Sequence, residues 1–220
     1  AGEPVAYVVG RAGFRHLDLF VDRRVLIPRP ETELVAEAAI ELAAGRRPVA
    51  VADLGTGSGA IGLSLAAELP IDGTTVWLAD ADADALAVAR ANLAGLDGQR
   101  AANVRIAEPG SWFDVLPADV RFDVVVANPP YVADQSPDVE PQVAAWEPQR
   151  ALFSGPDGLD DLRAIIAAAP GHLATDGWLV VEIGYDQGDA VGALLTAAGF
   201  GTVEIRRDLA GHDRIAIAGL

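Results

Sequence analysis

Residues 49–59 read Val-Ala-Val-Ala-Asp-Leu-Gly-Thr-Gly-Ser-Gly, and this stretch decides the fold. An apolar run with the length of a buried strand leads into three glycines at alternate positions, Gly55, Gly57 and Gly59. Residues 60–67 follow with helical composition and an apolar face. Glycine allows a positive φ and a close approach of the backbone to a ligand at the N-terminus of the next helix. The stretch therefore predicts the nucleotide-binding turn of a βαβ unit.

Two carboxylates frame this turn. Residues 76–80, Val-Trp-Leu-Ala-Asp, predict a second strand that ends at Asp80, about as far along the chain as the acid that reaches ribose hydroxyls in such units. Asp53 stands two residues ahead of Gly55, where a carboxylate would repel a pyrophosphate but could anchor the turn's N–H groups or favour a cationic ligand. The spacing Gly-x-Gly-x-Gly also differs from the Gly-x-Gly-x-x-Gly of nicotinamide-binding proteins. The pattern favours an adenosine-type ligand that carries positive charge and no phosphate, such as a sulfonium cofactor.

A second motif, Phe-Asp-Val-Val-Val-Ala-Asn-Pro-Pro-Tyr at residues 122–131, supplies the candidate chemistry. Its apolar strand ends at Asn128, because the two prolines that follow can continue neither a strand nor a helix. The prolines remove two N–H donors and leave a stiff loop that offers carbonyl oxygens. Asn128 adds a side-chain acceptor, and Tyr131 adds a ring that can stack on a planar group. Taken alone, the motif fits a proline-stiffened turn as well as it fits a site for a ligand that donates N–H groups.

Together with further segments, the two motifs resemble the class I S-adenosylmethionine-dependent methyltransferases that modify planar nitrogens. More narrowly, they resemble the HemK/PrmC family of peptide-chain release factor glutamine N5-methyltransferases, over nearly the whole chain. The further segments are residues 26–33 (Leu-Ile-Pro-Arg-Pro-Glu-Thr-Glu), 146–148 (Trp-Glu-Pro), 155–159 (Gly-Pro-Asp-Gly-Leu), 182–184 (Glu-Ile-Gly) and 208–214 (Asp-Leu-Ala-Gly-His-Asp-Arg). The resemblance implies a Rossmann-like α/β fold, with a seven-stranded, mostly parallel sheet that has a C-terminal antiparallel strand and is preceded by an N-terminal β-hairpin.

The resemblance also implies a reaction and its residues. The enzyme would transfer a methyl group from S-adenosylmethionine, leaving S-adenosylhomocysteine, to the side-chain amide nitrogen of the glutamine in the Gly-Gly-Gln motif of class-1 release factors. The residues implied for catalysis are Asn128, Pro129, Pro130 and Tyr131. Those implied for cofactor binding are Asp53, Gly55, Thr56, Gly57, Ser58, Gly59, Asp80, Trp112 and Asn128. Trp112 would cover the adenine face, although core filling is an equal interpretation of this side chain, and no metal site is expected.

The 220 residues carry 16 Lys and Arg side chains against 32 Asp and Glu, a formal net charge of −16, and contain no cysteine. Because phosphate contacts dominate nucleic-acid affinity, so acidic a chain is a poor candidate for binding duplex DNA directly. The absence of cysteine excludes disulfides, thiolate metal ligands and a thiol nucleophile. No apolar run reaches the length of about 18 residues that a membrane helix needs. We therefore expect a soluble cytoplasmic protein. We also expect a monomer, and the resemblance implies that its partner is the release factor.

Two regions are expected along the chain. Residues 1–27 predict a hairpin with β-rich arms around Gly10 and Gly13, and by resemblance it connects to a helical domain that helps recognise the release factor. The chain begins at Ala1 and has no methionine, so we expect that domain to precede it. Residues 28–220 form the expected methyltransferase domain. Its first helix starts at the Pro-Arg-Pro-Glu-Thr-Glu segment and carries on one face Leu34, Val35, Ala38 and Leu42.

The remaining elements follow from periodicity and turn signals. Helices are expected at residues 84–96, 159–169 and 189–198, and strands at residues 103–107, 178–183, 202–205 and 214–217. The last two strands have no helix between them and should pair antiparallel. Residues 132–154 contain several prolines and acids and predict a long irregular loop over the site. Within this loop, Glu147 is expected to support the backbone rather than to take part in chemistry.

Two other functions stay open at this level. Adenine presents the same planar N–H₂ group to an Asn-Pro-Pro-Tyr loop, so methylation of adenine N6 in a nucleic acid is an alternative, against which the charge of −16 counts. A non-catalytic nucleotide-binding module, or a dehydrogenase that uses the glycine turn, is a third reading. In that case the Asn-Pro-Pro-Tyr sequence would be accidental.

Overall fold

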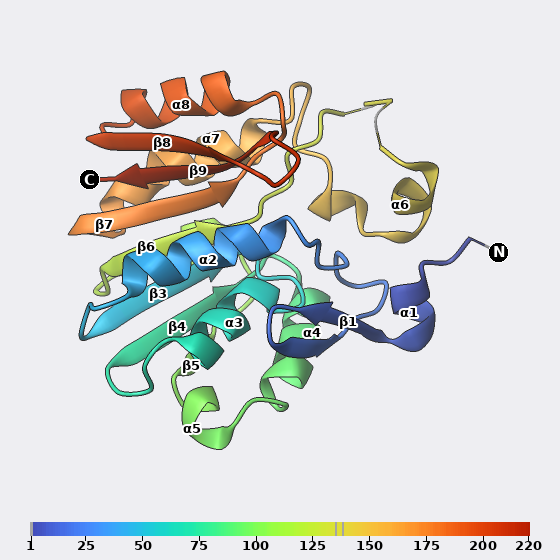
Figure 1. The fold of residues 1–220 in the computed structure, drawn as a ribbon, viewed down its shortest axis with the longest axis horizontal. Helices are drawn as coiled ribbons and strands as arrows, with labels where there is room; N and C mark the ends of the chain where they lie inside the picture. Colours follow the sequence, from blue (N-terminus) through green and yellow to red (C-terminus); the bar gives the residue numbers. More distant parts are fainter. Residues whose placement is uncertain (1, 135, 138) are drawn as a thin grey trace.

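The computed structural model describes residues 2–134, 136–137 and 139–220, and its main feature is a seven-stranded sheet (Figure 1). The strand order is β5-β4-β3-β6-β7-β9-β8. The strands are β3 (Val49–Leu54), β4 (Thr74–Ala79), β5 (Val104–Ile106), β6 (Phe122–Ala127), β7 (Leu173–Glu182), β8 (Thr202–Arg207) and β9 (Asp213–Gly219). The first five strands in this order, from β5 across to β7, are parallel to one another. Strand β9 pairs antiparallel with both β7 and β8. The expected sheet and its antiparallel C-terminal end are confirmed.

The central strands β3 and β6 are apolar except for Asp53 and Asp123, because helices cover both faces of the sheet. Successive side chains of a strand point to opposite faces. Accordingly Val51 and Val124 belong to one hydrophobic cluster, while Ala52 and Val125 belong to the other. All four are completely buried. The two motifs of the sequence are therefore carried by the two most protected strands of the molecule.

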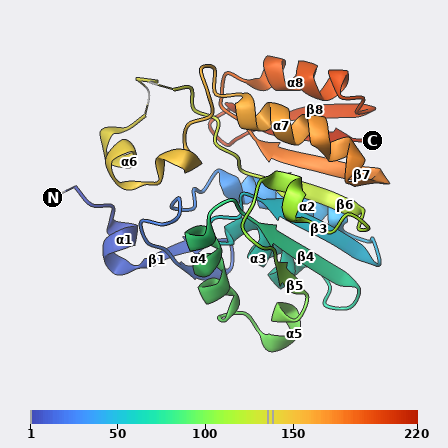
Figure 2. The same ribbon diagram turned by 180° about the vertical axis from the view of Figure 1, so that it is seen from behind.

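The covering helices divide between the two faces of the sheet. Helices α2 (Thr32–Ala43), α3 (Ala60–Glu68) and α4 (Ala83–Leu93) contribute to one cluster, and α7 (Asp160–Ala168) and α8 (Gly188–Ala197) to the other. Figure 1 shows α2 and α3 in front of the sheet, and Figure 2 shows α7 from behind. A further short helix, α5 (Gly98–Ala101), connects α4 to β5. No helix in the described part of the chain combines the length and the apolar character that crossing a bilayer requires.

The N-terminal segment differs in part from its prediction. Residues expected in the first arm of the hairpin form a short helix instead, α1 (Val5–Val9), and the hairpin consists of β1 (Arg11–Phe14) and β2 (Leu17–Phe20). Tyr7 explains the difference, because it is the only buried residue of α1 and its hydroxyl donates to the carbonyl oxygen of Val25 at 2.6 Å. A strand would bury alternate residues, whereas one helical turn buries a single side chain. Gly10, in the left-handed region at φ 73°, ends the turn.

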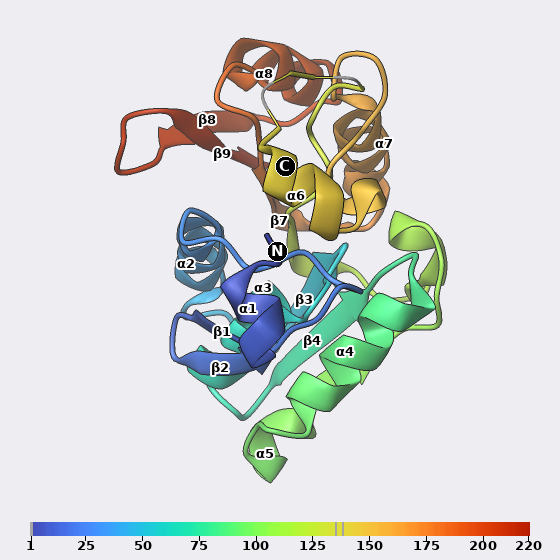
Figure 3. The same ribbon diagram turned by 90° about the vertical axis from the view of Figure 1, so that its right-hand side faces the viewer.

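The hairpin packs against the sheet's helices, near one end of the molecule (Figure 3). Phe14, Leu19 and Val21 belong to the same hydrophobic cluster as α2 and α3. Asn92 of α4 makes two hydrogen bonds to β2 and one to Ser58. Its oxygen accepts from the Phe20 N–H at 2.7 Å, and its nitrogen donates to the carbonyls of Phe20 at 3.0 Å and Ser58 at 2.8 Å. One side chain thus ties the hairpin to the loop that precedes α3.

The expected irregular loop at residues 132–154 contains two helical turns. They are α6 (Pro141–Trp146) and the 3₁₀ turn η2 (Gln149–Ala151). Pro141 occupies the first turn of α6, where its missing N–H costs no hydrogen bond. The prediction of a structureless loop is therefore wrong for these residues. Its placement over the site holds, because residues of η2 line the cavity described below.

The site forms where the strand order reverses. From β3 the chain crosses to β4 on one side, whereas β6 lies on the other side of β3 and is followed by β7. Ligands of open α/β sheets bind in the crevice that such a reversal leaves at the carboxyl ends of the strands. Figure 1 shows α1, the hairpin and α6 beyond this end of the sheet. The loops after β3, β4 and β6 open into the space that these elements border.

We expect Asn92→Ala to lower the free energy of unfolding by about 1–3 kcal/mol, because it leaves three backbone groups without their partner. Urea denaturation measures the change. Asn103→Ala is the matched control, since the Asn103 side chain donates one hydrogen bond, to the Ile71 carbonyl. A loss no larger than that of the control would contradict the role given to Asn92.

Candidate active site

The glycine turn after β3 adopts a backbone that only glycine takes without strain. Gly55, Gly57 and Gly59 have φ angles of 68°, 54° and 85°. The turn is closed by a hydrogen bond from the Gly59 N–H to the Thr56 carbonyl at 2.8 Å. The ring of Trp112 lies 3.3 Å from the position that a Cβ on Gly55 would occupy. A side chain at Gly55 would therefore meet both an unfavourable φ and the indole.

Asp53 holds this turn from behind. Its side chain is buried, and one oxygen, Oδ2, accepts from the Thr56 hydroxyl at 2.6 Å and from the Gly62 N–H at 2.9 Å. The other oxygen, Oδ1, is buried and has no partner in the described part of the chain. Burial raises the pKa of Asp53 to about 6, against the effect of these two hydrogen bonds. The result is a carboxylate with an unused acceptor beside the turn.

Asp80 stands at the end of β4 and connects two loops. Its oxygens accept from the Gly57 N–H and the Asp82 N–H, both at 2.9 Å. Burial raises the pKa of Asp80, and these two hydrogen bonds act in the opposite direction. Because Asp80 also lines the cavity, it presents a carboxylate edge whose direction the two backbone donors fix.

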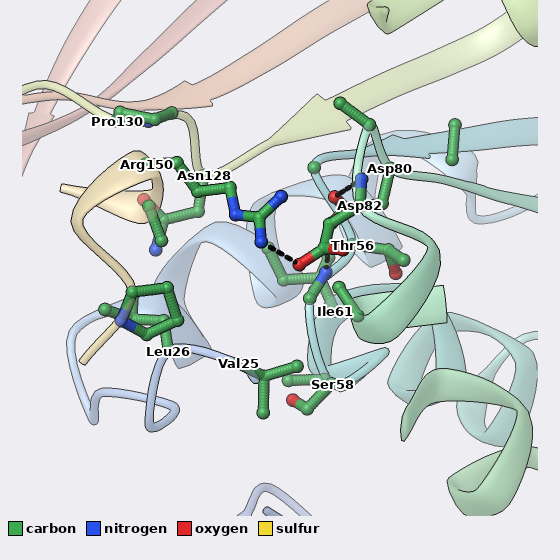
Figure 4. Close-up of a pocket in the computed structure, with 18 of the residues that line it drawn as sticks. Val25, Leu26, Thr56, Ser58, Ile61, Asp80, Asp82, Asn128, Pro130 and Arg150 are labelled. Carbon is green, nitrogen blue, oxygen red and sulfur yellow. Dashed lines mark hydrogen bonds and ion pairs between the residues drawn. The ribbon is translucent and has the colours of Figure 1, made fainter. Parts of the chain in front are cut away.

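A cavity opens in front of the glycine turn (Figure 4). Residues 55–58 of the turn line it, together with Asp80 and Trp112. The segment from Arg24 to Arg29, which follows the hairpin, supplies another wall. An ion pair between Arg150 and Asp82, 2.7 Å long, reaches across from η2 to the start of α4, as Figure 4 shows.

A second cavity adjoins the first at the Asn-Pro-Pro-Tyr loop. It is lined mainly by apolar side chains, with Tyr131 and the edge of Glu182 among the polar groups. The residues common to both cavities are Leu26, Arg29, Asn128 and Ala151. Asn128 therefore stands where the two spaces meet, and it contributes a side chain to each.

The Asn-Pro-Pro-Tyr loop is held by three separate contacts. The Tyr131 hydroxyl donates to Glu182 at 3.1 Å, and the Tyr131 carbonyl accepts from the Gln187 side chain at 2.9 Å. A Cβ on Gly158 would lie 2.3 Å from the Tyr131 carbonyl oxygen, so only glycine permits this approach. The third contact is a hydrogen bond from Asn128 Nδ2 to the Thr32 hydroxyl oxygen at 3.2 Å. The loop is rigid because both of its ends are pinned.

Glu147 plays the supporting part expected of it. Its buried carboxylate accepts from the Ile27 N–H at 3.0 Å and pairs with Arg29 at 2.5 Å. The pair ties the end of α6 to the segment that walls both cavities. This confirms that Glu147 supports the backbone, and it places Arg29 at the site as the partner of a carboxylate.

The structure brings most of the predicted site residues together. Eight line the first cavity, namely Gly55, Thr56, Gly57, Ser58, Asp80, Trp112, Asn128 and Pro130. Asp53 and Gly59 do not line it and lie behind the turn. Pro130 lines the first cavity and Tyr131 the second, whereas Pro129 is buried between them and lines neither. That these residues bind a cofactor and a substrate stays a prediction.

Sequence reasoning assigned no role to four residues that shape the site. These are Thr32, Glu182, Gln187 and Gly158. Three of them fall within segments that carried the family resemblance, and Gln187 follows closely after one. Membership of these motifs was the only signal in the sequence, and the partners of these residues at the site are 27 to 150 residues away along the chain. Only the folded chain could show which residues they contact.

Comparison with known proteins agrees with this geometry. Residues 33–146 match the family model described as the methyltransferase small domain. The release factor glutamine methyltransferase of Xylella fastidiosa (strain Temecula1) is 44% identical over 216 residues, which cover 98% of this chain and 76% of that protein. The enzyme of the same name from Pseudomonas aeruginosa is 46% identical over 216 residues, 98% of this chain and 75% of its own.

A solved structure gives the same relationship. It is the protein-(glutamine-N5) methyltransferase (release factor-specific) of Alicyclobacillus acidocaldarius. The alignment has 28% sequence identity and a TM-score of 0.52, and it covers 88% of this chain and 93% of that one. A methyltransferase from Pyrococcus furiosus, 16% identical with a TM-score of 0.66, shares the fold.

Asp53 should make the stability of the protein depend on pH. Because burial raises its pKa from 3.8 to about 6, the folded state binds a proton more readily than the unfolded state between these values. The free energy of unfolding then falls as pH rises from about 4 to 7, by about 3 kcal/mol from this group. The free energy of unfolding of Asp53→Asn lacks this dependence. We therefore expect it to increase relative to that of the parent protein by about 3 kcal/mol as the pH rises from about 4 to 7. Urea denaturation across this pH range measures it, and a difference that stays constant would refute the assignment.

Proposed function

The chain belongs to the release factor glutamine methyltransferase family, and from this premise we propose that it transfers a methyl group from S-adenosylmethionine to the side-chain amide nitrogen N5 of a glutamine. The glutamine is that of the Gly-Gly-Gln motif in class-1 peptide-chain release factors. One observation supports this most directly. Asn128 stands at the junction of two cavities, with its nitrogen bonded to Thr32 and its oxygen free of any hydrogen bond from the described residues.

The first cavity fits an adenosine-type cationic cofactor. The Asp80 carboxylate suits ribose hydroxyls, and the indole of Trp112 suits a flat base. Asp53, which lies behind the turn, serves the site by holding the Thr56 hydroxyl and the Gly62 N–H. S-adenosylmethionine, when bound, supplies an activated electrophilic methyl group. We propose that Gly55, Thr56, Gly57, Ser58 and Gly59 provide the backbone cradle for it.

The protein's task in this reaction is placement. The nitrogen of a glutamine amide is a poor nucleophile because its lone pair is delocalised. We propose that two acceptors, Asn128 Oδ1 and the backbone carbonyl of Pro129, take the two N–H groups of the amide and aim its lone pair into the first cavity. Pro130 keeps this loop stiff, and the ring of Tyr131 stacks on the amide plane from the second cavity. No residue is assigned the part of a strong base, because the nitrogen that gains the methyl group would carry a positive charge and its surplus proton could pass to water.

Magnitudes agree with a positioning mechanism. A neutral hydrogen bond contributes about 0.5–1.5 kcal/mol net. Holding two reactants in near-attack geometry is worth about 7–11 kcal/mol. Two hydrogen bonds alone therefore cannot account for the catalysis, whereas the rigid junction of two cavities can. This is why the pinned ends of the Asn-Pro-Pro-Tyr loop matter to the proposal.

The charges at the site favour a protein substrate over a nucleic acid. Three arginines line the first cavity, and each is already paired with a carboxylate: Arg24 with Asp22, Arg29 with Glu147, and Arg150 with Asp82. Phosphate binding would need cations that are free to replace counterions. With a chain charge of −16 as well, direct binding of nucleic acid is disfavoured.

The setting of the reaction follows from the same proposal. Methylation of a release factor would take place in the cytoplasm, where translation ends, with the enzyme acting as a monomer and apart from membranes. Residues 1–27 would serve as the connection to a helical domain that helps dock the release factor, and residues 28–220 as the catalytic domain. The contacts of α1 and the hairpin with this domain would then fix the angle at which such a connection leaves it.

We expect Asn128→Ala to abolish methyl transfer while the affinity for S-adenosylmethionine changes by no more than a few fold. The amide oxygen that orients the substrate is lost, whereas the turn that cradles the cofactor is intact. Mass spectrometry of the release factor and calorimetric titration of the cofactor measure the two quantities. Equal loss of both would contradict this division of labour.

The function itself is tested by incubating a purified class-1 release factor with S-adenosylmethionine and the protein, both as this chain and with the helical domain added. A mass increase of one methyl group on the Gly-Gly-Gln glutamine is the expected result. A release factor in which that glutamine is replaced by alanine is the matched control. Absence of methylation by both forms of the enzyme, with the cofactor bound, would overturn the assigned substrate and favour another planar nitrogen, such as adenine N6.

A further inference from the structure

A buried carboxylate that the reaction does not use lies directly behind the catalytic loop. Glu182 ends β7 and is 1% exposed. Each of its oxygens accepts a hydroxyl: Oε2 accepts from Thr32 at 2.6 Å, and Oε1 accepts from Tyr131 at 3.1 Å. Thr32 is itself buried, at the first position of α2. Three separate elements, β7, α2 and the Asn-Pro-Pro-Tyr loop, thus meet at one carboxylate.

The surroundings of Glu182 contain groups that favour its charged form. Burial raises the pKa of Glu182, but the Thr32 hydroxyl, the charge of Arg214 and the Tyr131 hydroxyl all act to lower it. Arg214 is held nearby by a hydrogen bond to the Ile183 carbonyl at 3.2 Å. An ionised carboxylate has only acceptor sites. In this ionised form, which the two contacts at 2.6 Å and 3.1 Å fit, both hydroxyls donate to Glu182.

The donation from Thr32 to Glu182 fixes the direction of the next hydrogen bond in the network, the one between Asn128 and Thr32. The Thr32 hydroxyl has one proton, and that proton points to Glu182. Toward Asn128, 3.2 Å away, the Thr32 oxygen can only accept. The amide of Asn128 must then turn its nitrogen to Thr32, which leaves its oxygen on the cavity side. A reversed amide would place two acceptors against each other at Thr32.

We propose that Thr32 and Glu182 are positioning residues that set the direction of hydrogen bonding at Asn128, so that a carbonyl oxygen and not an N–H₂ group faces the two cavities. The proposal rests on the proposed function, because it matters only if the substrate arrives with N–H groups to donate. Glu182 acts on Asn128 through Thr32. The same carboxylate fixes Tyr131, so both polar side chains of the loop depend on it.

A purely structural role for this network is the competing explanation. A well-packed apolar pair usually stabilises a core as well as buried charge does, or better. A charged group behind the loop is therefore a poor device for stability alone. It is, however, the simplest device that forces two hydroxyls to donate in a chosen direction.

Four variants separate the two explanations. Thr32→Val keeps the shape of the side chain and removes the hydroxyl, and Thr32→Ser keeps the hydroxyl. Glu182→Gln keeps the shape of the carboxylate but introduces an amide that must donate, and it can reverse the direction at Thr32. Thr74→Val is the matched control, because Thr74 is a buried threonine far from the site whose hydroxyl donates to the Pro70 carbonyl.

We expect kcat for release factor methylation to fall about tenfold in Thr32→Val, and at least as far in Glu182→Gln, in line with the loss of one to two kcal/mol of orienting hydrogen bonds. The Kd for S-adenosylmethionine and the KM for the release factor should change less than threefold. Thr32→Ser should recover most of the rate, and Thr74→Val should keep the rate of the parent protein.

A second measurement needs no substrate: the side-chain N–H₂ signals of Asn128 in a ¹⁵N-asparagine-labelled protein should shift and exchange faster in Thr32→Val and Glu182→Gln.

The outcomes are distinguishable. If the parent protein methylates the release factor and Thr32→Val equals Thr32→Ser in kcat and in the Asn128 signals, the proposal is wrong. If rate, affinity and thermal stability fall together in Thr32→Val and Glu182→Gln, the network is structural and the proposal is equally wrong. If the parent methylates no release factor, the proposed function fails, and the Asn128 signals still decide whether Thr32 and Glu182 set the amide's direction.

Discussion

The parallel pairing of β3 with β6 is the constraint on which the site depends. The register aligns Leu54 with Ala127, so the two strands end side by side and the chain leaves both at the same level. Gly55 and Asn128 are the next residues, and a Cβ on Gly55 would lie 4.0 Å from the Asn128 carbonyl oxygen. The cofactor turn and the catalytic loop are thus neighbours by virtue of one row of backbone hydrogen bonds. A slip of register would separate them.

Polar residues at the ends of neighbouring strands divide the work at this edge. Asp80 follows β4, Asn128 follows β6 and Glu182 ends β7, while Asp53 lies one residue before the end of β3. Asp80 and Asn128 line the first cavity and Glu182 lines the second, whereas Asp53 lines neither, and both Asp53 and Glu182 are buried. Burial raises the pKa of both buried carboxyls, which means that folding places them there at a cost in stability. Local violations of the apolar-core rule are expected at functional sites, and here the two buried acids each hold a loop in place.

The differences from the sequence-based expectations have a common physical cause. Residues 5–9 are rich in valine and favour a strand, but no neighbouring strand is available there, and the contact of Tyr7 with Val25 is made by a single helical turn. Residues 141–146 were expected in an irregular loop, and they form a helix whose end is fixed by Glu147 reaching Ile27 and Arg29. In both places a contact across more than 15 residues overrides the local preference. Such contacts leave no mark on periodicity.

The sequence by itself determined most of the strands and helices, their order along the chain, the glycine turn and the Asn-Pro-Pro-Tyr loop, because these follow from local patterns of apolar, glycine and proline residues. The seven-stranded sheet followed from the family resemblance. The sequence also determined eight of the residues that line the first cavity. Only the tertiary structure decided that Asp53 and Gly59 support the turn from behind, that Asn128 joins two cavities, and that Thr32 and Glu182 stand behind it. The reason is that the direction of a hydrogen bond depends on which partners burial brings together, and Thr32 and Glu182 are 150 residues apart in the chain.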